Sequence, residues 1–212
     1  MHAMQTEIFK RLGSLPKREA SFVEPMECLS VSKLPEDSRW LWEIKLDGYR
    51  AIAVKSASDV KLFSRQEKSL NTQFPYIVEG LADLPAETVV DGELVAIDDS
   101  GRPDFNLLQS FRSEASRIHY YVFDLLCCKG RDITHLPLIE RRALLTSVVA
   151  INNTKRRVDR EDSSKATKQP SLWTLVSLRS GHRSDLNPNS KEVTRRRLNS
   201  QSTALSGFET HA

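Results

Sequence analysis

Short runs of β-branched, aromatic and aliphatic residues, separated by turn formers, fill much of the first 146 residues of the chain. Such runs predict strands, and they span residues 40–46, 49–56, 60–65, 88–98 and 118–128. Residues 56–59, with the sequence Ser-Ala-Ser-Asp, predict a hairpin turn between the second strand and the third. The pattern therefore predicts a protein rich in β-hairpins.

Apolar residues at helical spacing follow three of these strands. The expected helices span residues 74–84, 105–111 and 138–148. Thr72 is expected to cap the first helix, Asp104 to cap the second and Pro137 to start the third. Strands in hairpins with helices inserted between them predict an α+β fold, with antiparallel sheets flanked by helices. A Gly-rich phosphate loop follows none of the strands, so Rossmann and P-loop folds have no support.

Charge divides the chain near residue 146. Residues 147–212 hold 12 of the 31 Lys and Arg residues and 6 of the 28 Asp and Glu residues, so this tail has a net charge of +6 and the rest −3. The tail also contains 17 Ser and Thr among its 66 residues. This composition predicts disorder, because little apolar surface is available to offset the entropy of ordering. A basic arm that contacts nucleic acid through phosphates is the alternative.

Other features exclude whole classes of protein. The longest apolar stretch, residues 120–128, is interrupted by Asp124, which argues against a membrane-spanning helix. The N-terminus has charges where a signal peptide needs an unbroken apolar segment. Three cysteines cannot form a disulfide framework and suit a reducing compartment. We therefore expect a cytoplasmic protein that does not enter the membrane.

The densest group of chemically useful side chains is the segment Glu-Ile-Lys-Leu-Asp-Gly-Tyr-Arg at residues 43–50. If a strand runs through it, alternation places Glu43, Lys45 and Asp47 on one face. A solvated strand edge of mixed charges explains an isolated K-x-D-G equally well. The segment by itself therefore does not identify a function.

Several motifs in the same order nevertheless resemble one family. K-L-D-G-Y-R at residues 45–50 resembles the nucleotidyl-transfer signature of ATP-dependent DNA ligases, and Ser64-Arg65 resembles that family's second signature. D-G-E-L-V at residues 91–95 and Y-V-F-D-L at residues 121–125 resemble two further signature strands. Residues 22–26, 101–109 and 137–142 also look like ligase sequence. The resemblance covers residues 21–146 and concerns in particular bacterial ligases of the end-joining type.

The resemblance implies a nucleotidyltransferase fold, an ATP-grasp-like adenylation domain, in which Lys45 becomes covalently linked to AMP. A lysine amine attacks the α-phosphate of ATP only when it is neutral, yet an unperturbed lysine has a pKa near ~10.4. The site must therefore lower that pKa by desolvation or with a nearby cation. Arg50 and a Mg²⁺ ion are the expected cations, and Mg²⁺ also offsets phosphate charge.

The family's other nucleotide contacts carry over to five positions. Arg50 and Arg65 are expected to lie against the nucleotide, since the arginine fork suits phosphate and ribose oxygens. Glu93 is the candidate for the ribose hydroxyls or an indirect metal contact. Phe123 is expected to stack on adenine, and Glu43 to accept from the adenine amino group.

Asp47 and Gly48 are expected to shape the turn that presents the nucleophile. For an isolated carboxylate such as Glu93, a surface position is the plain alternative. For an isolated aromatic such as Phe123, it is a packed core position.

The family pattern is not found after Thr146. Members of the family continue with an E-G-x-x-x-K strand, a K-x-K strand and an OB-type domain that grips DNA, and none of these follows here. We therefore expect an N-terminal arm at residues 1–20, a C-terminally incomplete adenylation domain at 21–146, and a tail at 147–212 that is disordered or arises from a shifted reading frame. The missing motifs lead us to expect reduced or no activity.

The function expected from the resemblance is that of an ATP-dependent DNA ligase that seals nicks or breaks in duplex DNA as a monomer, in repair, replication or recombination. Another lysine nucleotidyltransferase, an RNA ligase or an mRNA-capping guanylyltransferase, is one alternative. A non-catalytic fragment that binds nucleotide or associates with DNA is another. Lysine-linked adducts formed with ATP or with GTP would separate the enzymes, and the absence of any adduct would indicate the fragment.

Overall fold

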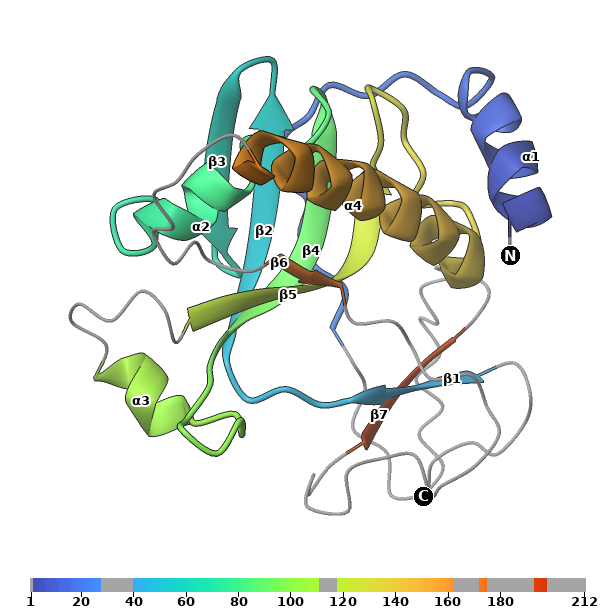
Figure 1. The fold of residues 1–212 in the computed structure, drawn as a ribbon. Coiled ribbons are helices and arrows are strands. Elements are labelled where there is room, and N and C mark those ends of the chain that lie inside the picture. The colour runs from blue at the N-terminus through green and yellow to red at the C-terminus, as the bar shows by residue number, and fades with distance from the viewer. Residues whose placement is uncertain (1, 28–39, 111–117, 162–171, 175–192, 198–212) are drawn as a thin grey trace, which may run out of the picture.

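The computed structural model describes residues 2–27, 40–110, 118–161, 172–174 and 193–197 (Figure 1). Its helices are α1 (His2–Leu12), α2 (Pro75–Gly80), α3 (Phe105–Gln109) and α4 (Leu138–Glu161). Its strands are β1 (Trp40–Ile44), β2 (Tyr49–Ser56), β3 (Asp59–Ser64), β4 (Thr88–Ala96), β5 (Ile118–Cys127), β6 (Leu172–Thr174) and β7 (Val193–Arg197). All five expected strands and all three expected helices are present.

The main sheet has five strands in the order β3-β2-β4-β5-β6. The first four are antiparallel to their neighbours, and β6 joins the edge of β5 in parallel. Ser56 pairs with Asp59, so the expected hairpin is confirmed, and Ala57 in its turn has a positive φ of 38°. A separate two-stranded sheet pairs β1 with β7.

The two faces of the main sheet are covered differently. Figure 1 shows α4 lying across one face, with α2 beside β3. This face carries the larger apolar cluster, in which Leu94 and Tyr120 of the sheet pack with Leu144 of α4. The opposite face carries a smaller cluster that includes Ile52 and Leu126. Alternation along the strands sends successive side chains to the two clusters.

The helix boundaries test the capping predictions. The Asp104 side chain accepts from the Leu107 N–H at 3.0 Å, so the expected cap of α3 is confirmed. The expected cap of α2 is wrong, because that helix begins at Pro75, directly after buried Phe74, and has no side-chain cap. The N-cap position is taken by Phe74, two residues after Thr72. Residue 111, expected on the face of α3, lies outside the described residues.

Helix α4 starts as expected after Pro137, whose carbonyl accepts from the Glu140 and Arg141 N–H groups. It runs to Glu161 and so passes through the proposed boundary at residue 146. The strands β6 and β7 also fall within residues 147–212. The expectation of disorder otherwise concerns residues outside the described ranges and stays a prediction.

Residues 7–20, part of the segment expected to form an N-terminal arm, pack onto the rest of the chain. Ile8 and Leu12 of α1 belong to the larger apolar cluster, and Arg18 pairs with Asp132 at 2.8 Å. The apolar positions of α1 alone gave no sign of this contact, because their partners are far away in sequence. In the parts of the chain that the structure describes, no helix combines the length and the apolar character needed to cross a membrane.

Candidate active site

Lys45 lies in the connection between β1 and β2. β1 ends at Ile44 and β2 begins at Tyr49, and the Lys45 side chain is exposed. The expectation that Glu43, Lys45 and Asp47 share one strand face is therefore wrong, because strand pairing ends before Lys45 is reached. The nucleophile proposed from the sequence is carried by a loop.

Gly48, at the end of this loop, lies in close contact with β4. Its N–H donates a hydrogen bond to the Glu93 carboxylate. A Cβ atom on Gly48 would lie 2.1 Å from the Leu94 carbonyl oxygen and 3.0 Å from Cγ of Glu93. Only glycine permits so close a backbone approach. The expected contribution of Gly48 to the turn thus has a steric basis.

Three neighbouring strands place one row of side chains beside this loop. In the register of the sheet, Arg50 of β2 is opposite Glu93 of β4, and Glu93 is opposite Tyr121 of β5. Residues paired across antiparallel strands point to the same face. Alternation from Arg50 to Ile52, a member of the smaller cluster, identifies this as the face opposite α4.

Arg50 makes the central contact of the site. Its Nε and Nη2 atoms donate to Oδ1 and Oδ2 of Asp91, each at 2.5 Å. The side chain of Asp91 is 3% exposed and that of Arg50 is 20% exposed. The guanidinium carbon of Arg50 also lies 4.6 Å from the centre of the Phe123 ring. One cation therefore compensates a buried carboxylate and packs on an aromatic ring at the same time.

Phe123 reaches this position through an irregularity in β5. Asp91 pairs with Asp124, and the next residue, Gly92, pairs with Val122. Phe123, which lies between Val122 and Asp124, is therefore the extra residue of a β-bulge. Such a bulge re-aims the side chain of the extra residue and often lies beside an active site. Phe123 is 6% exposed, with Arg50 over its ring.

Glu93 has an unusual electrostatic environment. Burial is the main cause that raises the pKa of this carboxyl, and the nearby charges of Asp91 and Asp47 add to it. Arg50 and the Gly48 N–H oppose this and stabilise the carboxylate. A carboxylate that is partly desolvated and carries neighbouring negative charge is suited to bind a cation or hydroxyl groups.

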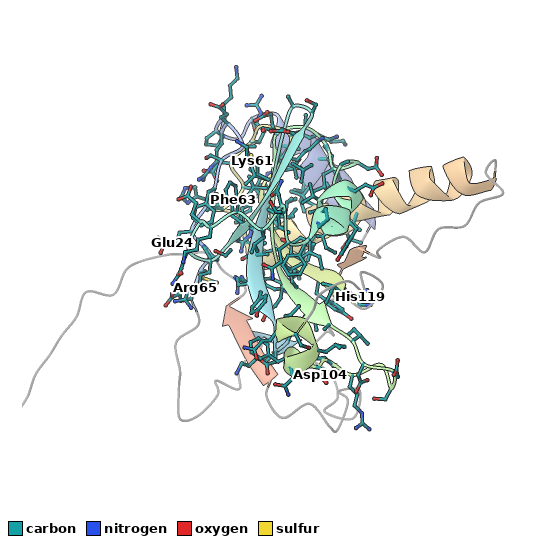
Figure 2. The ribbon with its side chains drawn as sticks, turned by 90° about the vertical axis from the view of Figure 1, so that its left-hand side faces the viewer. Glu24, Lys61, Phe63, Arg65, Asp104 and His119 are labelled. Carbon is teal, nitrogen blue, oxygen red and sulfur yellow. The ribbon has the colours of Figure 1, made fainter. Side chains whose placement is uncertain are left out.

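Arg65 lies apart from this cluster. It follows the end of β3, and its exposed side chain forms an ion pair with Glu27. Figure 2 shows Glu24, Phe63 and Arg65 along one side of the molecule. The Phe63 ring packs edge-on against Phe22, with centroids 5.8 Å apart. No described contact brings Arg65 to Arg50.

Glu43 is placed by the backbone alone. It belongs to β1 and pairs with Thr194 of β7. The direction of its side chain lies outside what the structure describes, so its expected contact with adenine stays a prediction.

Sequence reasoning missed Asp91 and Tyr121 as members of the site. Asp91 follows two valines in an apolar strand. A carboxylate in such a strand needs a buried partner, and this signal was available in the sequence. Tyr121 lies two residues before Phe123 and so shares its face, but its relation to Glu93 depends on the register of strands 28 residues apart, which alternation does not fix.

Among the described residues, no group of three or more His, Cys, Asp or Glu side chains is arranged to hold a metal ion. The carboxylate of Asp91 is occupied by Arg50. Glu93, with Asp47 near it, is the carboxylate of the site that remains for a cation.

Comparison with known proteins identifies the family. Residues 23–180 match the model of the family described as "ATP dependent DNA ligase domain". The chain belongs to the ATP-dependent DNA ligase family. The resemblance inferred from residues 45–50, 91–95 and 121–125 is thereby confirmed, and the match extends past residue 146.

Curated relatives are ligases or ligase-like proteins. The chain is 35% identical over 130 residues to the SPbeta prophage-derived DNA ligase-like protein LigB of Bacillus subtilis. The aligned region covers 60% of this chain and 47% of the relative. It is 36% identical over 126 residues to the multifunctional non-homologous end joining protein LigD of Pseudomonas aeruginosa, covering 58% of this chain and 15% of the relative. The chain thus spans less than half the length of these relatives.

Solved structures support the fold. The crystal structure of the ligase domain of Mycobacterium tuberculosis LigD matches with a TM-score of 0.58 at 27% identity, over 77% of this chain and 50% of that one. A mycobacterial DNA ligase D complexed with ATP and MES matches with a TM-score of 0.60 at 25% identity, over 88% and 55%. The expected α+β nucleotidyltransferase fold is confirmed.

Proposed function

We propose that the chain carries the adenylation step of an ATP-dependent DNA ligase, with Lys45 as the nucleophile. The observation that carries this proposal is the convergence of Arg50, Glu93 and Phe123 on one face of the sheet, beside the loop that bears Lys45. These side chains come from three different strands, and each belongs to a motif of the family.

The proposed step is a nucleotidyl transfer. The neutral Nζ of Lys45 attacks the α-phosphorus of ATP, a P–N bond forms, and the P–O bond to the β-phosphate breaks. Pyrophosphate leaves with that electron pair, and the proton lost by the amine passes to solvent. Arg50 supplies positive charge beside the developing negative charge, which is worth most where water is excluded.

Base recognition is assigned to Phe123. The ring is buried next to the guanidinium of Arg50, and adenine is proposed to stack on it. A second arginine, Arg65, is proposed to approach the nucleotide from the end of β3 after release from Glu27. Glu43 is proposed to accept from the adenine amino group.

Magnesium fits the site as an ion that arrives with the nucleotide. Mg²⁺ is commonly held by one or two carboxylates together with substrate phosphates, and Glu93, with Asp47 near it, offers such a carboxylate. The ion would neutralise phosphate charge. Asp91 would not take part, because its carboxylate is paired with Arg50.

The later steps are proposed from the family. AMP passes from Lys45 to a 5′-phosphate at a nick or break in duplex DNA, and the 3′-hydroxyl then displaces it. The DNA repair named for LigD supports a place in repair, and we extend the proposal to replication and recombination. We propose that the protein acts as a cytoplasmic monomer.

The adenylation step is tested by incubating the purified full chain with Mg²⁺ and either ATP or GTP, followed by intact mass measurement. We expect one AMP adduct with ATP, none with GTP, and none in Lys45→Ala. An adduct that persists in Lys45→Ala contradicts the choice of nucleophile. A GTP adduct favours a guanylyltransferase, and the absence of any adduct favours a non-catalytic fragment.

A further inference from the structure

Tyr120 connects two strands that are not neighbours. It belongs to β5 and is fully buried on the α4 side of the sheet. Its hydroxyl donates to the Ala51 carbonyl oxygen of β2 at 2.8 Å. Since β4 lies between β2 and β5, this hydrogen bond crosses a whole strand.

Gly92 of β4 makes the crossing possible. A Cβ atom on Gly92 would lie 2.6 Å from Cε2 of Tyr120 and 2.5 Å from the Tyr121 carbonyl oxygen. In the register, Gly92 is opposite Ala51, the residue whose carbonyl receives the bond. The ring of Tyr120 therefore passes over β4 at the one position where β4 has no side chain to block it.

The same three strands carry the site on their other face. Asp91 and Glu93 flank Gly92, and Arg50 precedes Ala51. The charges of Asp91 and Arg50 also act on the Tyr120 hydroxyl. Burial is the main cause that raises the pKa of Tyr120, the charge of Asp91 adds to it, and the charge of Arg50 opposes it. The phenol thus stays protonated and remains a donor.

We propose that Tyr120 is a positioning residue for the nucleotide site. Its hydrogen bond fixes β2 relative to β5 across Gly92 and thereby holds the guanidinium of Arg50 over the ring of Phe123. This inference rests on the proposed function where it concerns ATP, but its geometric content does not. Phenylalanine would fill the same core volume, and the hydroxyl alone makes the connection to Ala51.

The test compares Tyr120→Phe with Tyr76→Phe, which removes the same atom from a half-buried tyrosine of α2. The first measurement is the NMR resonance of the Arg50 Nε–H, assigned with Arg50→Lys, because a proton near an aromatic face experiences the ring current. We expect this resonance to move in Tyr120→Phe and to stay in place in Tyr76→Phe, while thermal denaturation shows both variants folded.

The second measurement is the rate of AMP adduct formation against ATP concentration. In Tyr120→Phe we expect the half-saturating ATP concentration to rise about tenfold, with a smaller change in the rate at saturation. A purely structural contribution would instead lower stability and leave the concentration dependence unchanged.

An unchanged Arg50 resonance in folded Tyr120→Phe overturns the inference, as does an unchanged ATP dependence in an active protein. If the parent chain forms no AMP adduct, the proposed function fails. The Arg50 resonance still decides whether Tyr120 positions the guanidinium.

Discussion

Arg141 of α4 donates from Nε and Nη2 to the two carboxylate oxygens of Asp124 in β5, each at 2.8 Å, in the interior of the protein. The two side chains are 7% and 5% exposed. Arg141 also donates from Nη1 to the Leu136 carbonyl oxygen at 2.6 Å. The pair joins α4 to the strand position that directly follows Phe123, and so connects the helix to the site.

Removing one member of this pair should be costly. Arg141→Met leaves a buried carboxylate without compensation, and we expect a loss of about 3–5 kcal/mol in the free energy of unfolding, measured by urea denaturation. Adding Asp124→Leu should recover much of the loss, because a buried pair can be replaced by apolar side chains.

The matched control is Arg11→Met, which removes an exposed arginine that lies 3.7 Å from Glu140. It should change the free energy of unfolding by less than about 1 kcal/mol. Equal losses in Arg11→Met and Arg141→Met would contradict this account of the buried pair.

Gly48→Ala tests the contact between the Lys45 loop and β4. The new Cβ would overlap the Leu94 carbonyl oxygen, so we expect a loss of about 1–3 kcal/mol in stability and loss of AMP adduct formation. Gly13→Ala is the control, since nothing lies within 4 Å of a Cβ at that position. Normal adenylation by Gly48→Ala would show that the close approach is not needed.

Arg50→Lys keeps the positive charge but removes the planar guanidinium and its several N–H donors. Lysine cannot donate to both oxygens of Asp91 while lying flat on Phe123. The lysine ammonium would no longer be held in place by Asp91, so we expect a rise of about tenfold in the half-saturating ATP concentration. Arg102→Lys, at an exposed turn, should behave as the parent. Unchanged ATP dependence in Arg50→Lys would remove Arg50 from the nucleotide site.

The pH dependence of stability tests the environment of Glu93. Burial raises its pKa in the folded protein above the ordinary value of 4.5. The folded state therefore favours the protonated form of Glu93. The stability that this preference contributes is fully present below pH 4.5 and is lost as the pH rises through the folded pKa.

We expect Glu93→Gln to be more stable than the parent at pH 7, with the difference disappearing as the pH falls towards 4.5. Urea denaturation across this range measures the effect. Glu19→Gln, which removes an exposed carboxylate, is the control variant. A difference that is independent of pH would mean that desolvation does not act on Glu93.

The sequence was most informative where structure is decided locally. The β-branched runs, the hairpin at residues 56–59 and the Asp104 cap follow from the side chains present at those positions, and all were found. The order of four family motifs also led to Lys45, Arg50, Glu93 and Phe123 as candidates, and the structure brings the last three together.

What the sequence could not predict depends on distant segments. The pairing of Arg50 with Asp91 joins residues 41 positions apart, and the packing of α1 requires α4 to be in place. The end of β1 before Lys45 coincides with the end of its pairing with the distant strand β7, where Ile44 lies opposite Val193. Alternation within one segment contains no information about such partners.

The close approach of Gly48 to Leu94 limits how far Lys45, the proposed nucleophile, can move. The backbone is pinned at Gly48 and cannot separate from β4 without breaking the hydrogen bond to Glu93. Lys45 lies three residues before Gly48, so its movement is limited by the short segment between them. Under the proposed function, the distance between the amine and Gly48 is limited by three residues of chain and one lysine side chain.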